Sequence, residues 1–187
     1  MRLLETIHII NGQALHLEYH QNRLESSRKT LGLNTSLNLS LKPPKTGEYR
    51  CRVLYKDSIE KVEYIPYQQQ PIHSFKLIHS QIDYSLKFED RSALNLLLQD
   101  KENADEIIII KNGLITDTSI ANLAFYNGEK WLTPRTPLLK GTTRQRLLDE
   151  GKIVCADIHY KDVNNFSKIA VMNAMTDFCI IEDAIIT

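Results

Sequence analysis

The residues whose types could do chemistry gather in the stretch from Gly113 to Arg144, GLITDTSIANLAFYNGEKWLTPRTPLLKGTTR. Near its end, Gly141, Thr142 and Thr143 stand directly before an expected helix. A glycine and two hydroxyl residues at a helix start offer free backbone N–H groups, hydroxyl donors and the positive end of the helix dipole. These groups favour an anion, and phosphate above all, although the same triplet also serves as an ordinary helix cap.

Other side chains in the chain have the chemistry of a small-molecule site. Lys87 lies just ahead of an apolar helical segment, and Arg23 lies early in a predicted helix. Asp117 is a carboxylate in a polar turn, and Asn173 with Ala174 follows a predicted strand. Taken singly, each is also typical of a structural position, such as a surface lysine, a solvated arginine or a turn residue.

The composition of the chain excludes several classes of protein. Its 187 residues include 23 Lys and Arg and 23 Asp and Glu, so a formal charge of zero argues against a nucleic-acid binder. Cys51, Cys155 and Cys179 show no C-x-x-C spacing, which indicates reduced thiols and neither a disulfide frame nor a metal site. The chain shows no signal segment and no apolar run of membrane-spanning length, so we expect a soluble cytoplasmic protein without a membrane contact.

The hydrophobic pattern predicts an α+β fold with mostly antiparallel strands and three or four helices. One helix is expected at residues 19–31, with Leu24 and Leu31 on its buried face, and another at 144–150. Four successive isoleucines at 107–110 are typical of a strand buried on both faces. Further strands are expected at 3–10, 13–17, 48–55, 59–67, 75–79, 123–126, 131–132, 153–156, 168–172 and 178–181.

A linker divides the chain in this interpretation. The segment Gln68-Gln69-Gln70-Pro71 is polar and carries a proline, which is typical of a domain boundary. We therefore predict a small N-terminal α+β subdomain over residues 1–70 and a larger C-terminal subdomain over residues 71–187.

Six short motifs stand in an order that resembles a known enzyme family. They are L-E-T-I at residues 4–7, H-Q-N-R-L at 20–24, L-K-F-E-D-R-S-A-L-N at 86–95, A-D-E-I-I-I-I-K-N-G-L-I-T-D-T-S-I-A-N-L at 104–123, T-P-R with G-T-T-R at 133–144, and V-M-N-A-M at 171–175. In this order the chain resembles the fold-type IV pyridoxal-phosphate enzymes, the class IV aminotransferases and their lyase relatives. The resemblance covers nearly the whole chain and implies a D-amino-acid-aminotransferase-like fold of two small α/β subdomains.

The resemblance also implies a role for each candidate. Lys87 stands at the position of the lysine that holds the cofactor's aldehyde. Asp117 stands where a carboxylate faces the pyridine nitrogen, although the family usually has the longer glutamate there. The phosphate is expected to be bound by Arg23, by Thr142 and Thr143 at the helix start, and by the turn at Asn173 and Ala174.

Other departures from the family concern the ends of the chain and two motifs. Relatives usually have a further segment before the first motif and continue past the last. This chain has Leu4 where they have phenylalanine, and Lys56-Asp57 where many have Arg-Gly. The cation that would bind the substrate carboxylate stays open between Lys56 and Arg91.

Three functions remain after this comparison of motifs. The N-A-M element favours a lyase that converts 4-amino-4-deoxychorismate into 4-aminobenzoate and pyruvate. The alternatives are an aminotransferase for branched-chain or D-amino acids, which would use the same residues, and a non-catalytic homologue. Relatives bind the cofactor as homodimers, so a homodimer is expected, with the apolar strand at residues 3–10 as the surface that needs a partner.

Overall fold

The computed structural model describes all 187 residues, and the chain divides into two compact units. The first unit consists of Met1–Gln69 together with Leu86–Asp90. The second consists of Gln70–Ser85 together with Arg91–Thr187. The structure therefore differs from the expected division, because Leu86–Asp90 was assigned to the C-terminal subdomain and belongs to the first unit.

Backbone pairing explains why this short segment belongs to the first unit. Lys87 O accepts a hydrogen bond from Leu4 N at 2.9 Å, and Glu89 N donates to Arg2 O at 3.0 Å. These two backbone hydrogen bonds hold the segment at the edge of β1. The position of the linker in the sequence had placed it in the C-terminal subdomain.

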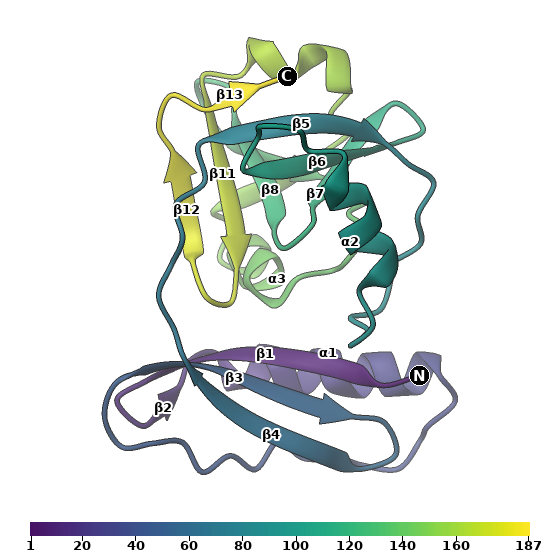
Figure 1. Ribbon diagram of the computed structural model, residues 1–187, viewed down its shortest axis with the longest axis vertical. Coiled ribbons are helices and arrows are strands. Elements are labelled where there is room, and N and C mark those ends of the chain that lie inside the picture. Colours follow the sequence, from purple (N-terminus) through teal and green to yellow (C-terminus); the bar gives the residue numbers. More distant parts are fainter. The chain divides into compact units, whose positions relative to one another are not determined.

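The first unit is a four-stranded antiparallel sheet with one helix against it (Figure 1). The strand order is β2-β1-β3-β4. The elements are β1 (Leu3–Ile10), β2 (Gln13–Ala14), α1 (Leu17–Thr30), β3 (Glu48–Tyr55) and β4 (Ile59–Pro66). Asn11 and Gly12 connect β1 to β2 with φ angles of 47° and 83°, the left-handed values that a tight Asn-Gly hairpin turn requires.

The helix α1 packs on the sheet through a stripe with helical spacing. His20, Leu24, Ser27 and Arg28 are its buried residues. Leu31 was expected on this stripe, and that expectation is wrong: α1 ends at Thr30, and Leu31 is 41% exposed beyond its end. Three of the stripe's four residues are polar, so their hydrogen bonds must be satisfied inside the unit.

The second unit is built on a larger sheet. Its elements are β5 (Ser74–His79), α2 (Ser92–Gln99), β6 (Glu106–Lys111), β7 (Leu114–Thr118), β8 (Asn122–Tyr126), β9 (Trp131–Pro134), α3 (Thr142–Asp149), β10 (Ile153–Ala156), a 3-10 helix η1 (Tyr160–Asn165), β11 (Lys168–Asn173), β12 (Asp177–Ile181) and β13 (Ile185–Ile186). The order is β10-β9-β8-β7-β6-β5-β13, and β11 pairs with both β8 and β12. Three pairings are parallel, namely β5 with β6, β5 with β13 and β9 with β10, and the others are antiparallel.

The core of the second unit surrounds its central strands. The isoleucines Ile107–Ile110 of β6 are all buried, which confirms the expectation of a strand covered on both faces. Ile108 packs in one cluster with Phe75 of β5, Ile115 of β7, and Leu123 and Phe125 of β8. No helix in the structure has the length and apolar character needed to cross a membrane. The fold is thus α+β, as predicted.

Candidate functional site

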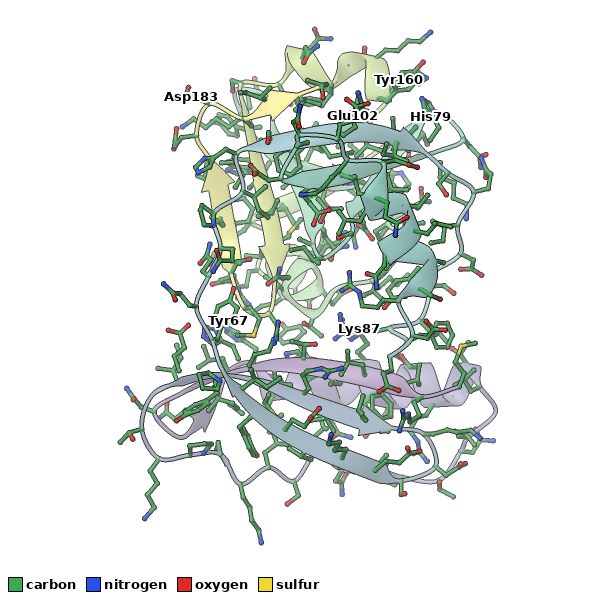
Figure 2. The ribbon with its side chains drawn as sticks, in the orientation of Figure 1. Tyr67, His79, Lys87, Glu102, Tyr160 and Asp183 are labelled. Carbon is green, nitrogen blue, oxygen red and sulfur yellow. The ribbon has the colours of Figure 1, made fainter.

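Lys87 lies on the edge of the first unit's sheet, on the segment that pairs with β1 (Figure 2). Phe88, the next residue, forms an antiparallel bridge with Leu3. β3 pairs with the whole of β1 along one edge, so this segment and β2 share the other edge. There is room for both, because β2 pairs only with Ile9 and Ile10 at the far end of the strand. Lys87 is half-buried and stands beside the part of β1 that carries Glu5.

Glu5 is the centre of a buried polar cluster in the first unit. Its carboxylate has no exposed surface and accepts hydrogen bonds at both oxygens. Arg23 donates to it from Nε at 2.8 Å and from Nη2 at 2.5 Å, and His20 Nδ1 lies 2.7 Å from Oε2. His20 and Arg23 reach the same carboxylate because residues three apart share one face of α1.

The charges of this cluster follow from its contacts. Burial works to raise the pKa of Glu5, but the charge of Arg23 and the hydrogen bonds from His20 and Arg23 outweigh it and lower the pKa to about 2. Burial lowers the pKa of His20, the charges of Arg23 and Lys87 add to this effect, and Glu5 opposes it. Glu5 is therefore an ionised acceptor, and a neutral His20 must donate to it through Nδ1–H.

The helix start in the second unit has the character of an anion site. Thr142 and Thr143 are each 6% exposed and occupy the first two positions of α3. The first backbone N–H of α3 to be bonded within the helix is that of Gln145, which donates to Gly141 O at 3.0 Å. Two threonine hydroxyls and free N–H groups at the positive end of a helix fit a phosphate.

Asp117 lies close to this helix start, in a buried hydrogen-bond network. Its Oδ1 accepts from Asn122 Nδ2 at 2.7 Å, and its Oδ2 accepts from Leu139 N at 2.8 Å. Burial raises the pKa of Asp117 to about 7, against the hydrogen bonds from Leu139 and Asn122 and the charge of Arg144. Each carboxylate oxygen has two lone pairs, so both oxygens can accept a further hydrogen bond, and a pyridine N–H suits them chemically.

The turn at Asn173 and Ala174 has a structural task of its own. Asn173 Oδ1 accepts hydrogen bonds from Met175 N at 2.8 Å and from Thr176 N at 3.0 Å, which shape the turn between β11 and β12. Asn173 Nδ2 lies 3.4 Å from Ile120 O, so this turn meets the one that follows Asp117. The phosphate role of Asn173 and Ala174 stays a prediction.

The two cations left open for the substrate carboxylate have partners within their own units. Arg91 Nη2 donates to Ser119 O at 2.9 Å, in the turn after Asp117. Lys56 Nζ lies 3.6 Å from the carboxylate of Asp57, and its side chain is 45% exposed. Neither contact singles out one of them for the substrate.

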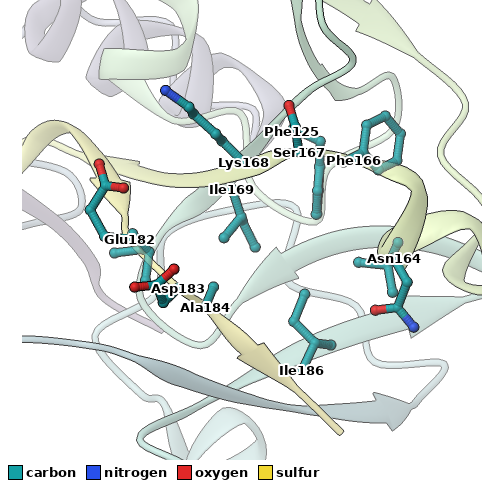
Figure 3. A pocket seen from close by; sticks show the side chains of 12 residues that line it. Phe125, Asn164, Phe166, Ser167, Lys168, Ile169, Glu182, Asp183, Ala184 and Ile186 are labelled. Carbon is teal, nitrogen blue, oxygen red and sulfur yellow. The ribbon is translucent and has the colours of Figure 1, made fainter.

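A separate pocket of about 320 Å³ opens in the second unit, next to the start of β11. Figure 3 shows Ile169 and Ile186 pointing into it from two segments, with Glu182 and Asp183 on another side. None of the residues predicted to bind the cofactor lines this pocket. Its position therefore adds nothing to the predicted cofactor site.

Sequence reasoning missed three residues that organise these sites: Glu5, Asn122 and Leu139. Glu5 could have been found, because it stands among Leu3, Ile7 and Ile9 on the buried face of an alternating strand, where an acidic residue needs partners. The two hydrogen bonds of the Leu139 peptide have no such signal, because a backbone contact leaves no mark on the residue type.

The groups present fit pyridoxal phosphate in kind. The first unit holds Lys87 as an amine and Arg23 as a cation, and the second holds the α3 N-terminus for a phosphate and Asp117 as a buried carboxylate. The pairing of Arg23 with Glu5 reduces the net charge that Arg23 would offer to a phosphate. The free groups of α3 are therefore the better-supported phosphate contact.

Comparison with known proteins gives matches along most of the chain. Residues 90–182 match the family described as amino-transferase class IV. An uncharacterized protein of Haemophilus influenzae is 42% identical over 182 residues, which cover 92% of this chain and 97% of that protein. A Schizosaccharomyces pombe protein, provisionally named an aminodeoxychorismate lyase, is 23% identical. The aligned region covers 95% of this chain and 87% of that protein.

Solved structures agree with these matches. A Haemophilus somnus protein, provisionally named a 4-amino-4-deoxychorismate lyase, is 39% identical with a TM-score of 0.83, covering 93% of this chain and 96% of that one. A hypothetical aminotransferase of Mycobacterium tuberculosis, in a PLP-bound form, is 16% identical with a TM-score of 0.80, covering 99% and 81%. At that identity the second likeness shows the fold alone.

Proposed function

This chain belongs to the class IV aminotransferase family, and on that premise we propose that it is a pyridoxal-phosphate-dependent lyase that converts 4-amino-4-deoxychorismate into 4-aminobenzoate and pyruvate. The observation that carries the proposal is the 39% identity, over 96% of its length, to the Haemophilus somnus protein provisionally given that activity. The threonine hydroxyls and the free N–H groups at the start of α3 support a phosphate-bearing cofactor.

In this proposal each candidate residue has a role. Bound pyridoxal phosphate supplies an aldehyde that reacts with amines and a ring that withdraws electrons. Lys87 would hold the cofactor through Nζ and, when the substrate amine has displaced it, would take the proton from the carbon that bears that amine. Thr142, Thr143 and the α3 N-terminus would bind the phosphate, with Arg23, Asn173 and Ala174 as further contacts, and Asp117 would supply the carboxylate for the ring nitrogen.

The direct test incubates the purified protein, loaded with pyridoxal phosphate, with 4-amino-4-deoxychorismate. We expect 4-aminobenzoate and pyruvate in equal amounts. Parallel reactions with branched-chain and D-amino acids and keto acids test the aminotransferase alternative, which would replace the lyase if only they turn over. A protein that takes up no cofactor and turns over neither set would be a non-catalytic homologue.

A second test concerns Lys87 itself. Borohydride treatment of the loaded protein should fix a pyridoxyl group on the peptide that contains Lys87. Lys87→Ala should abolish this labelling, and Lys168→Ala, a change at an exposed lysine, should leave it intact. Labelling that persists in Lys87→Ala would show that another lysine holds the cofactor.

We also propose that the protein is a homodimer, as the resemblance implies. The expectation that the strand at residues 3–10 needs a partner surface is wrong, because Leu3, Ile7 and Ile9 of β1 are already buried within the first unit. Light scattering at micromolar concentration should give twice the mass of one chain. A fully active monomer would contradict this proposal.

A further inference from the structure

Asp117 and Asn122 form a side-chain pair across the turn that connects β7 to β8. They lie opposite each other in the antiparallel pairing of these strands, and Asn122 Nδ2 donates to Asp117 Oδ1 at 2.7 Å. Both are buried, with 4% and 6% exposure. Directly opposite residues of an antiparallel pair extend from the same face of the sheet, so the two side chains can bind a third group together.

That third group is the backbone of Leu139. Asp117 Oδ2 accepts a hydrogen bond from Leu139 N at 2.8 Å, and Asn122 Nδ2 donates to Leu139 O at 2.8 Å. Both hydrogens of the Asn122 amide are thereby used, one on Asp117 and one on Leu139. The pair thus hydrogen-bonds to both backbone groups of Leu139. This residue lies two positions before Gly141, the N-cap residue of α3.

A close contact extends this arrangement to the first residue of the helix region. A Cβ atom added at Gly141 would lie 2.0 Å from Asn122 Oδ1, far inside van der Waals contact. The φ of Gly141 is −70°, which any residue can adopt, so the requirement for glycine comes from this contact and from no backbone strain. Asn122 therefore touches the chain on both sides of Lys140, at Leu139 and at Gly141.

We propose that Asn122 is a positioning residue. With Asp117 it forms a clamp, by which we mean the two hydrogen bonds to the Leu139 backbone, and through its contact with Gly141 it fixes the α3 N-terminus in the position that binds a phosphate. This inference rests on the proposed function, because the phosphate is that of the proposed cofactor. Thr142 and Thr143 supply the contacts, and Asn122 sets their direction through the chain that precedes them. A displacement of the helix start by about 1 Å is enough to weaken several charge-assisted hydrogen bonds together.

The test compares the affinities for pyridoxal phosphate and for pyridoxal, which lacks the phosphate. Asn122→Ala should weaken pyridoxal phosphate binding about tenfold or more, the equivalent of losing one to two hydrogen bonds, and change pyridoxal binding by less than about threefold. Asn127→Ala, one residue beyond the other end of β8, is the matched control and should change neither affinity. Equal losses for both ligands in Asn122→Ala, or no loss, would overturn the positioning role.

A double-mutant comparison tests the contact with Gly141. Gly141→Ala should weaken pyridoxal phosphate binding because the new Cβ meets Asn122 Oδ1. In Gly141→Ala combined with Asn122→Ala that oxygen is absent, so the combined loss should be smaller than the product of the single losses. Losses that simply multiply would show that the two residues act independently.

Amide hydrogen exchange tests the clamp without any cofactor. In the cofactor-free protein, Asn122→Ala should speed exchange at Leu139 and at the start of α3, and leave α1 of the first unit unchanged. Unchanged exchange at Leu139 would refute the clamp. If the wild type binds no pyridoxal phosphate, the proposed function fails, while the exchange result still decides whether Asn122 holds the helix start.

Discussion

Arg23 donates a hydrogen bond to each carboxylate oxygen of Glu5, from Nε to Oε1 at 2.8 Å and from Nη2 to Oε2 at 2.5 Å. Glu5 has no exposed surface, and the Arg23 side chain is 12% exposed. A buried ion pair of this kind depends on both partners, because removing one leaves the other charged in a dry site. The same arginine is expected to contact the cofactor phosphate, so its structural and binding roles must be separated.

The first prediction separates the two roles of Arg23. Arg23→Met should destabilise the cofactor-free protein by roughly 3 kcal/mol, because Glu5 then lacks its partner. Adding Glu5→Gln should restore a large part of the free energy of unfolding, since no buried charge is left. Urea unfolding measures both. Cofactor affinity should stay about one to two decades below wild type in the double variant. Its recovery would show that Arg23 makes no phosphate contact.

The second prediction concerns acid stability. The pKa of Glu5 in the folded protein is lowered from 4.5 to about 2. The ionised form is therefore favoured by folding, and this stabilisation is present above pH 4.5 and is lost as the pH falls from 4.5 towards 2. The shift is equivalent to about 3 kcal/mol. Glu5→Gln should flatten the fall in unfolding free energy across that range, as measured by urea titrations at several pH values. An unchanged slope would contradict the assigned charge.

The third prediction concerns Arg28, a fully buried arginine on α1. It donates to the backbone oxygens of Thr35, Lys56 and Asp57 and to the Thr35 hydroxyl, and so ties the helix to the turn between β3 and β4. Arg28→Ala removes four partly buried hydrogen bonds and the packing of a buried side chain, and should cost about 3 kcal/mol or more of unfolding free energy. Arg50→Ala, an exposed arginine on β3, should change it by less than about 0.5 kcal/mol. Equal effects would show that the Arg28 contacts contribute little.

The contrast between Ile107–Ile110 and Leu86–Asp90 shows how far sequence predicts this fold. The isoleucine run was identified correctly because a strand buried on both faces must be apolar throughout. The Asn-Gly pairs at residues 11–12 and 112–113 are also readable from sequence, because few other residue pairs accept the positive φ that both positions adopt. The attachment of Leu86–Asp90 to β1 was missed, because it depends on backbone hydrogen bonds between distant parts of the chain.

The candidate site was likewise predicted only in part from the sequence. Thr142 and Thr143 were predicted from residue types at a helix start, and the structure places both at the first two positions of α3. The partner of Arg23 was not predicted, although Glu5 stood on an apolar strand face. The contacts of Asp117 with Leu139 could not be predicted, since any residue type at 139 offers the same backbone groups.

The last prediction concerns the charge of Asp117, whose pKa burial raises from 3.8 to about 7. The folded protein thus holds this proton more tightly than the unfolded chain does. Its contribution to stability is complete below pH 3.8 and is lost as the pH rises from 3.8 to about 7, by up to about 4 kcal/mol. This direction is opposite to that of Glu5, and the pH ranges differ.

Asp117→Asn removes this titration and keeps the shape of the side chain. The variant loses one acceptor oxygen from the clamp, a cost of about 1–3 kcal/mol that does not depend on pH. The free energy of unfolding of the cofactor-free wild type should therefore exceed that of the variant most at pH 4, and the difference should shrink steadily towards pH 8. Urea unfolding of both proteins across this range measures it. A difference that stays constant from pH 4 to pH 8 would mean that Asp117 is already ionised throughout, and that its hydrogen bonds from Leu139 and Asn122 outweigh its burial.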